Sequence, residues 1–142
     1  MRSTLWVLLV LALVAWVGVV GAAPPKEKDE ATEVVTGTVQ KLESDVDKYE
    51  DGRVITKYTA VLKVDKVERT TPEGNRVVKD GECVTVRWSH VTRRDGSTAG
   101  HIYSLHESDV VRVWLCRYCG MRPDFYPVEN DKAFEKISGK KP

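Results

Sequence analysis

An excess of charge of either sign is missing from this sequence, and its absence argues against a dedicated nucleic-acid binder. Lysine and arginine number 22, aspartate and glutamate 21, and the formal net charge is +1. Residues 1–22 contain a single charged residue, Arg2, so the remainder carries 21 basic and 21 acidic residues. Nucleic-acid binders owe much of their affinity to a basic face that neutralises phosphates. We therefore do not expect nucleic acid as a partner, although a local basic patch stays compatible with this balance.

Catalytic signatures are missing as well. The sequence contains no Gly-x-Ser-x-Gly motif, in which a nucleophilic serine is exposed on a sharp turn. Serine and acidic residues lie near His90, His101 and His106 in sequence, but a nucleophile and its base must meet in space. We expect the histidines to be solvated, the alternative being a weak pH-sensitive or metal-binding loop. No catalytic residue and no cofactor is predicted.

One long apolar run opens the chain, and we expect it to form an N-terminal apolar helix before the domain. From Leu5 to Ala23, seventeen of nineteen residues are apolar, the other two are glycines, and Arg2 gives a positive start. This order is typical of a secretory signal, and we expect cleavage after Ala22. The alternative is a retained membrane anchor, because about 20 apolar residues span a bilayer. Both place the rest of the chain outside the cytoplasm, either secreted or periplasmic, or tethered by residues 5–23.

The rest of the chain divides into three parts. Residues 23–32 are charged and lack apolar periodicity, so we expect a flexible linker there. Residues 33–137 are expected to form one domain, and residues 138–142 a disordered tail. No internal repeat is found in the domain.

Alternation with a period of two predicts that the domain is all-β. Gly37 suits a bend or bulge in the first strand, and Asp51-Gly52 a tight turn between two long strands. The region Val91–Ser108 breaks the alternation, and His101–His106 within it is expected to form a helical turn or short strand. Trp88 is expected in the core. The predicted strands are Glu33–Val46, Val54–Val67, Cys83–His90, Val110–Cys116 and a short edge strand within Phe125–Ile137.

Five such strands predict a small closed or partly open barrel. A resemblance to a known fold rests on three sequence segments. These are Gly37-Thr38-Val39, Asp80 to Val86 (DGECVTV) and Asp109 to Leu115 (DVVRVWL). In this order the chain resembles OB-fold domains, in particular small exported domains of bacterial cell envelopes, over residues 33–137. The resemblance implies a five-stranded barrel that binds oligonucleotides, oligosaccharides or proteins, and it carries over no catalytic residue. The alternative is a small β-sandwich, which periodicity does not separate from a barrel.

Cys116-Arg117-Tyr118-Cys119-Gly120 is the most pointed local motif, and its spacing fits three kinds of site. A redox dithiol needs a low-pKa first cysteine, usually at a helix start, whereas this pair follows a strand. A zinc ion needs four ligands, and only Cys83 and the three histidines remain to complete them. The third interpretation is a disulfide formed after export, with Cys119 bonded to Cys83 or Cys116 and one thiol left over.

Trp114 is the best candidate for a residue that contacts a ligand. By the alternation in its strand it points away from the core together with Arg112, and Arg87 is a further candidate for that face. A tryptophan beside arginine suits stacking on a sugar, a base or an aromatic side chain. The alternative, which we favour slightly, is that the Val91–Ser108 loop or the C-terminal segment covers Trp114.

The expected function is that of a non-enzymatic binding or interaction domain in an extracytoplasmic space. The expected partner is an envelope or extracellular protein or a glycan, together with the membrane if the apolar run is retained. The alternative is a metal-binding or thiol-redox protein that uses Cys116 and Cys119.

Overall fold

The computed structural model describes residues 27–71, 77–117 and 124–138. The apolar run 5–23, Cys119 and residues 139–142 lie outside these ranges. A short 3-10 turn, η1 (Lys28–Glu30), precedes the strands. The strands are β1 (Glu33–Lys48), β2 (Val54–Thr70), β3 (Cys83–Thr92), β4 (Thr98–Ala99), β5 (Val110–Arg117), β6 (Phe125–Pro127) and β7 (Phe134–Ser138).

Five of these strands close into a barrel. β1 pairs with β2, β2 with β3, β3 with β6, β6 with β5, and β5 again with β1. The β3–β6 pair is parallel and the other four are antiparallel. The prediction of an all-β domain with a closed five-stranded barrel is confirmed. The β-sandwich alternative is wrong, because β6 bridges β3 to β5 and β1 closes the ring.

Two further strands were not predicted. β4 pairs with the end of β3 after a tight turn in which Gly96 has a positive φ of 83°. The single edge strand expected within Phe125–Ile137 is two strands, β6 and β7, which both pair with β5. β6 is paired on both sides, so the edge position belongs to β7. The described segment His101–His106 forms neither a helical turn nor a strand.

The long first hairpin bends at a glycine, as expected. The β1–β2 register shifts at three places, one of them between Thr36 and Gly37. A Cβ atom at Gly37 would lie 2.6 Å from the backbone oxygen of Lys63, so only glycine allows β2 to approach this closely. The bend lets β1 pair with β5 over Glu33–Thr38 and with β2 over its whole length.

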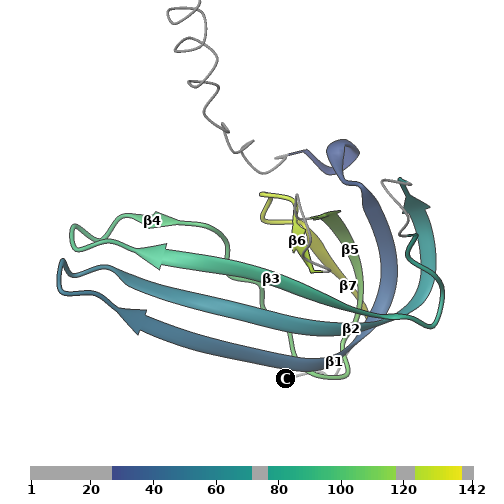
Figure 1. Cartoon of the computed structure of the whole chain (residues 1–142), viewed down its shortest axis with the longest axis horizontal. Helices are drawn as coiled ribbons and strands as arrows, with labels where there is room; N and C mark the ends of the chain where they lie inside the picture. The colour runs from purple at the N-terminus through teal and green to yellow at the C-terminus, as the bar shows by residue number, and fades with distance from the viewer. Residues whose placement is uncertain (1–26, 72–76, 118–123, 139–142) are drawn as a thin grey trace, which may run out of the picture.

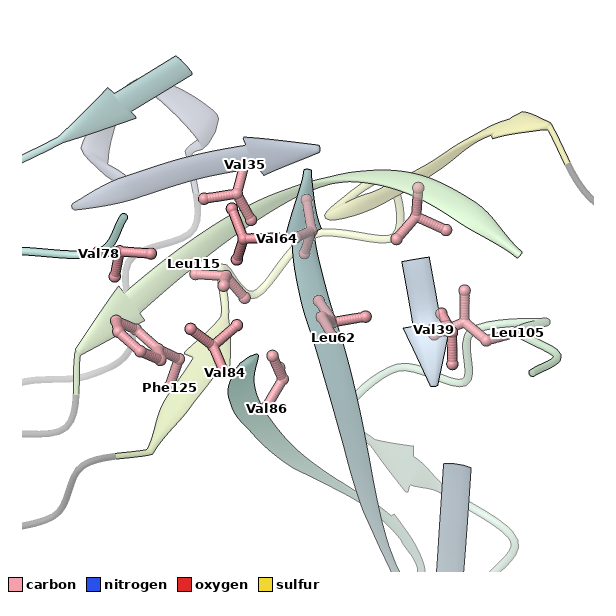
Figure 2. Packing of buried hydrophobic residues seen from close by; sticks show 12 residues of the cluster. Val35, Val39, Leu62, Val64, Val78, Val84, Val86, Leu105, Leu115 and Phe125 are labelled. Atoms are coloured by element: carbon pink, nitrogen blue, oxygen red, sulfur yellow. The ribbon is translucent and has the colours of Figure 1, made fainter. Parts of the chain in front are cut away.

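The barrel is filled by inward-pointing valines and leucines with one phenylalanine. Figure 2 shows how the labelled side chains of Val35, Leu62, Val84 and Phe125 converge from different strands. A second, smaller buried cluster lies around Trp114, on the opposite side of β5 from this core. Its members are Ala31, Val34, Trp114, Cys116, Val128 and Ala133.

The first three strands continue well beyond the closed barrel. β5 covers β1 only as far as Thr38, and β6 pairs with β3 only at Val86. Beyond these points β1, β2 and β3 run on side by side, with β4 along the end of β3 (Figure 1). We call this extension the arm. It consists of Lys41–Lys48 with Val54–Thr59 and Arg87–Ala99.

The charged segment before β1 is ordered against the barrel from Lys28 onward. Ala31 is buried, and the Arg69 side chain donates hydrogen bonds to the carbonyl oxygens of Lys28 and Ala31 at 2.9 and 2.8 Å. Thr32 Oγ1 donates to the carbonyl oxygen of Leu115 at 3.3 Å. The expected flexible linker over residues 23–32 is therefore corrected: residues 28–32 belong to the domain, because its strands offer donors and an apolar contact to them.

Candidate binding surface on the arm

The structure places Cys83 and Cys116 apart and gives both as free thiols. Cys83 opens β3 and is exposed, whereas Cys116 lies buried in β5. β6 lies between these two strands, so the cysteines are not cross-strand neighbours. No disulfide is formed between the cysteines in the described ranges. The pairings that involve Cys119, which lies outside them, stay predictions.

Burial determines the chemistry open to the Cys116 thiol. Burial raises the pKa of Cys116, and the opposing influence of the Thr32 amide and the Arg69 charge is smaller. A redox centre needs the opposite shift, since the thiolate is the nucleophile. Within the described parts of the chain, no group of three or more side chains could hold a metal ion. The thiol-redox and metal interpretations therefore gain no support from this geometry.

Trp114 points away from the barrel core, in agreement with the alternation, but it is covered. The residue is only 8% exposed and packs with Ala31 and Val128. The ammonium nitrogen of Lys28 lies 3.6 Å from the indole centroid, and the guanidinium carbon of Arg112 lies 4.8 Å from it. An exposed Trp114 is therefore wrong, and the alternative of a covered Trp114 holds. Val128 and Ala133 of the C-terminal segment belong to its cluster, and Tyr103 of the Val91–Ser108 loop packs against that cluster. The N-terminal segment adds to this cover.

The two arginines predicted beside Trp114 are engaged by carboxylates. Arg112 donates to Glu68 at 2.5 Å, and Arg87 donates to Asp124 at 2.7 Å. Both ion pairs are partly exposed, so each contributes little to stability. Arg87, Arg112 and Trp114 consequently do not form an open stacking surface.

The pairing register gives the arm two chemically different faces. Residues directly opposite each other on antiparallel strands point to the same side of the sheet. The core-side face, which continues the barrel interior, carries three rows: Ser44, Tyr58 and Trp88; Val46, Thr56 and His90; Lys48, Val54 and Thr92. The outer face also carries three rows: Glu43, Thr59 and Arg87; Asp45, Lys57 and Ser89; Asp47, Ile55 and Val91. Five of these nine outer side chains are charged, but only Lys48 is charged among the core-side nine.

Four aromatic rings meet where the core-side face joins the barrel. Tyr58 and Trp88 are stacked, with ring centroids 5.3 Å apart and planes within 12°. Tyr103 meets Trp88 edge-on at 5.6 Å, and Phe134 of β7 packs 5.4 Å from Trp88 and 4.8 Å from Tyr103. All four residues are half-buried. We call them the aromatic cluster.

Tyr103 holds the cluster to the C-terminal segment. Its hydroxyl donates to the carbonyl oxygen of Asn130 at 2.8 Å. Burial raises the pKa of Tyr103 above its ordinary value of 10.0, and the charges of Asp131 and Glu129 act in the same direction. The hydroxyl therefore stays protonated at neutral pH. His101 lies beside this ring, with centroids 6.1 Å apart.

Trp88 was expected in the core, and this expectation is corrected. Its side chain packs against the core at the mouth of the barrel, but it is only half-buried. Its indole nitrogen Nε1 is shielded from solvent, yet no hydrogen-bond partner for it occurs among the described residues. A buried donor without an acceptor is rare in folded proteins and costs about 1–3 kcal/mol.

An exposed apolar side chain lies beside the aromatic cluster. Val46, in the row next to Tyr58, is 50% exposed. The sequence analysis missed this surface, although Tyr58 and Trp88 both fall on the inward parity of their strands. What it lacked was the β2–β3 register that places Tyr58 opposite Trp88, since alternation within each strand does not specify how two strands are aligned.

Comparisons with known proteins add no relative. No protein-family model, curated protein or solved structure matches this chain. In the described ranges, no helix is both long and apolar enough to cross a membrane.

Proposed function

We propose that this chain is an exported, non-enzymatic binding domain with an OB-like barrel, and that its partner binds to the core-side face of the arm. Support for export comes from the apolar run 5–23 behind Arg2. Support for the OB-like interpretation comes from the strand order β1-β2-β3-β6-β5, which returns to β1. In OB-folds, the face of the second and third strands frequently binds the ligand.

The aromatic cluster, half-buried beside exposed Val46, is the observation that carries this proposal. A structural core would bury such rings fully, whereas tyrosine and tryptophan with one wet side are enriched at binding surfaces. Exposed apolar residues gathered at one place mark an interaction site more often than isolated ones do. The same face has a single charged side chain, so it suits an uncharged partner and not a polyanion such as nucleic acid.

Binding assays on the full chain test the proposal. The ligands are panels of glycans, uncharged peptides and oligonucleotides, and the variants are Tyr58→Ala and Val46→Asp. We expect the full chain to bind a member of the glycan or peptide panel, with at least about tenfold weaker binding in both variants, because stacking is lost in one and an unpaired charge is placed on the face in the other. Val46 is already half-exposed, so Val46→Asp keeps the fold.

Asp45→Asn is the matched control, since it changes a charge one residue away on the outer face of the same strand. It is expected to leave binding unchanged. The proposal is overturned if binding persists in Val46→Asp and Tyr58→Ala, or if Asp45→Asn weakens it equally.

A further inference from the structure

We infer that the ligand of the core-side face is an uncharged oligosaccharide whose sugar ring stacks at Tyr58 and whose hydroxyl oxygens are bound by neutral side chains. This inference rests on the proposed binding function and names the ligand class for the same surface. Its two supports are the placement of charge and the mixture of aromatic and hydroxyl groups on this face.

Charge is separated between the two faces by the register of the strands. Glu43, Asp45 and Lys57 are among the charged residues that point to the outer face, where Lys57 pairs with Asp47. On the core-side face, Lys48 stands at the end of the arm, three rows from the barrel. A charged ligand would lose solvation on this face and gain one countercharge at most. An uncharged ligand loses less solvation and is therefore favoured.

Neutral polar groups alternate with apolar ones along the same face. The row next to Tyr58 brings Val46, Thr56 and His90 side by side. Sugars present apolar C–H faces and a rim of hydroxyl groups, so they need stacking surfaces together with neutral donors and acceptors. Tyr58 supplies the ring, while Thr56 and His90 supply a hydroxyl and an imidazole at the neighbouring position.

Trp88 holds the Tyr58 ring in place for stacking. It lies directly opposite Tyr58 in the strand register, and the two rings are stacked with their centroids 5.3 Å apart. Its own indole nitrogen is shielded from solvent, so a ligand that stacks at Tyr58 does not contact that nitrogen.

An extended peptide fits the arm less well. Peptides that add a strand need an open edge with unpaired backbone groups. In the described structure β5 does not cover the far end of β1, whose sequence is Glu43-Ser44-Asp45-Val46-Asp47-Lys48. Charged side chains at alternate positions are a common device against strand addition.

Native gel electrophoresis of the full chain in gels that contain a soluble polysaccharide tests the inference. The neutral probes are a β-glucan, a xyloglucan and a mannan, and the acidic probes are alginate and polygalacturonate. We expect at least one neutral polysaccharide to retard the chain and neither acidic one to do so. Retardation should become about tenfold weaker in Tyr58→Ala and Val46→Asp.

Four outcomes would overturn the inference. If uncharged peptides are the only ligands and their binding depends on Tyr58 and Val46, the sugar is rejected and the proposed function stands. A dimer that is seen in sedimentation velocity and depends on Val46 would show that a second copy of the chain, and not a sugar, covers this face. Retardation by the acidic polysaccharides would reject an uncharged ligand. Absence of binding to every probe, with Asp45→Asn and wild type equally folded, rejects the inference and the proposed function together.

Discussion

Asp109 is the buried charge that organises the turn before β5. Its carboxylate accepts a hydrogen bond from the His106 amide at 2.8 Å, and the Lys136 ammonium lies 3.0 Å away. Burial raises the pKa of Asp109, but the Lys136 and His106 hydrogen bonds and charges outweigh it, so the pKa falls below its ordinary value of 3.8. One residue thereby joins the His106–Asp109 turn to β7, the strand that contributes Phe134 to the aromatic cluster.

The lowered pKa of Asp109 gives a pH-dependent prediction. Stability from a carboxylate with a lowered pKa is fully present above its unfolded pKa and is lost as the pH falls through the folded value. We expect Asp109→Asn to lower the free energy of unfolding by about 2 kcal/mol at pH 7 and by much less at pH 2.5. Urea denaturation at both pH values measures this.

Asp95→Asn is the control for Asp109→Asn. Asp95 is an exposed aspartate whose pKa is also lowered, mainly by hydrogen bonds from Ser97 in its own turn. Its replacement should change stability little at either pH, because water solvates the exposed groups. An equal loss at pH 7 and pH 2.5 for Asp109→Asn would contradict a role for its ionised form.

At the scale of the element, the bend of β1 depends on Gly37. The Cβ of an alanine would lie 2.6 Å from a backbone oxygen of β2, which no rotamer change can relieve. We expect Gly37→Ala to lower the free energy of unfolding by at least about 2 kcal/mol, since β1 must separate from β2 or from β5. Thermal unfolding followed by circular dichroism measures the loss.

Gly96→Ala is the control for Gly37→Ala, because it tests the cost of a positive φ without a steric clash of the new Cβ atom. Gly96 has a positive φ of 83°, but no atom lies within 4 Å of the position that a Cβ would take. The expected cost is about 1 kcal/mol, from the left-handed backbone alone. If Gly96→Ala proves as costly as Gly37→Ala, the close approach of the strands is not what requires Gly37.

At the scale of the whole molecule, the domain begins before its first strand. η1 and the residues after it lie across Trp114: the Lys28 ammonium lies over the indole ring and pairs with Glu135 at 2.6 Å, and Ala31 is buried in the Trp114 cluster. This cover holds β1, β5 and β7 to one another from outside the barrel. Among the described residues, the chain itself thus covers the side of the barrel that Trp114 occupies, whereas the core-side face of the arm keeps partly exposed side chains.

Shortening the chain tests this boundary. A chain that begins at Glu33 should unfold at a temperature about 5–10 °C lower than one that begins at Glu27, because the Arg69 hydrogen bonds and the burial of Ala31 and Trp114 are lost. Differential scanning calorimetry compares the two. Equal melting temperatures would mean that residues 27–32 rest on the barrel without stabilising it.

The sequence predicted the strands well and the surfaces poorly. Alternation located β1, β2, β3 and β5 because each has one face toward a core and one toward polar surroundings. The sequence did not predict the two-residue β4 or the division of the last strand, because such short segments show no alternation of apolar and polar residues. Trp114 was assigned to the correct side of its strand, yet its cover comes from residues 31 and 128, which are distant in sequence.

The binding surface shows the same limit more clearly. Tyr58 and Trp88 are thirty residues apart, and neither stands out in its strand until the register brings them together. Their partial exposure also depends on where β5 and β6 stop covering β1 and β3, which no local pattern specifies.

By itself, the sequence determined that the domain is all-β, where its long strands lie and that Gly37 bends the first of them, because hydrophobic period and glycine act over a few neighbouring residues. Only the tertiary structure decided which tryptophan is covered, which residues share a face and where the barrel gives way to the arm. These depend on contacts between residues far apart in the chain, and a single step in register would exchange the two faces of every strand.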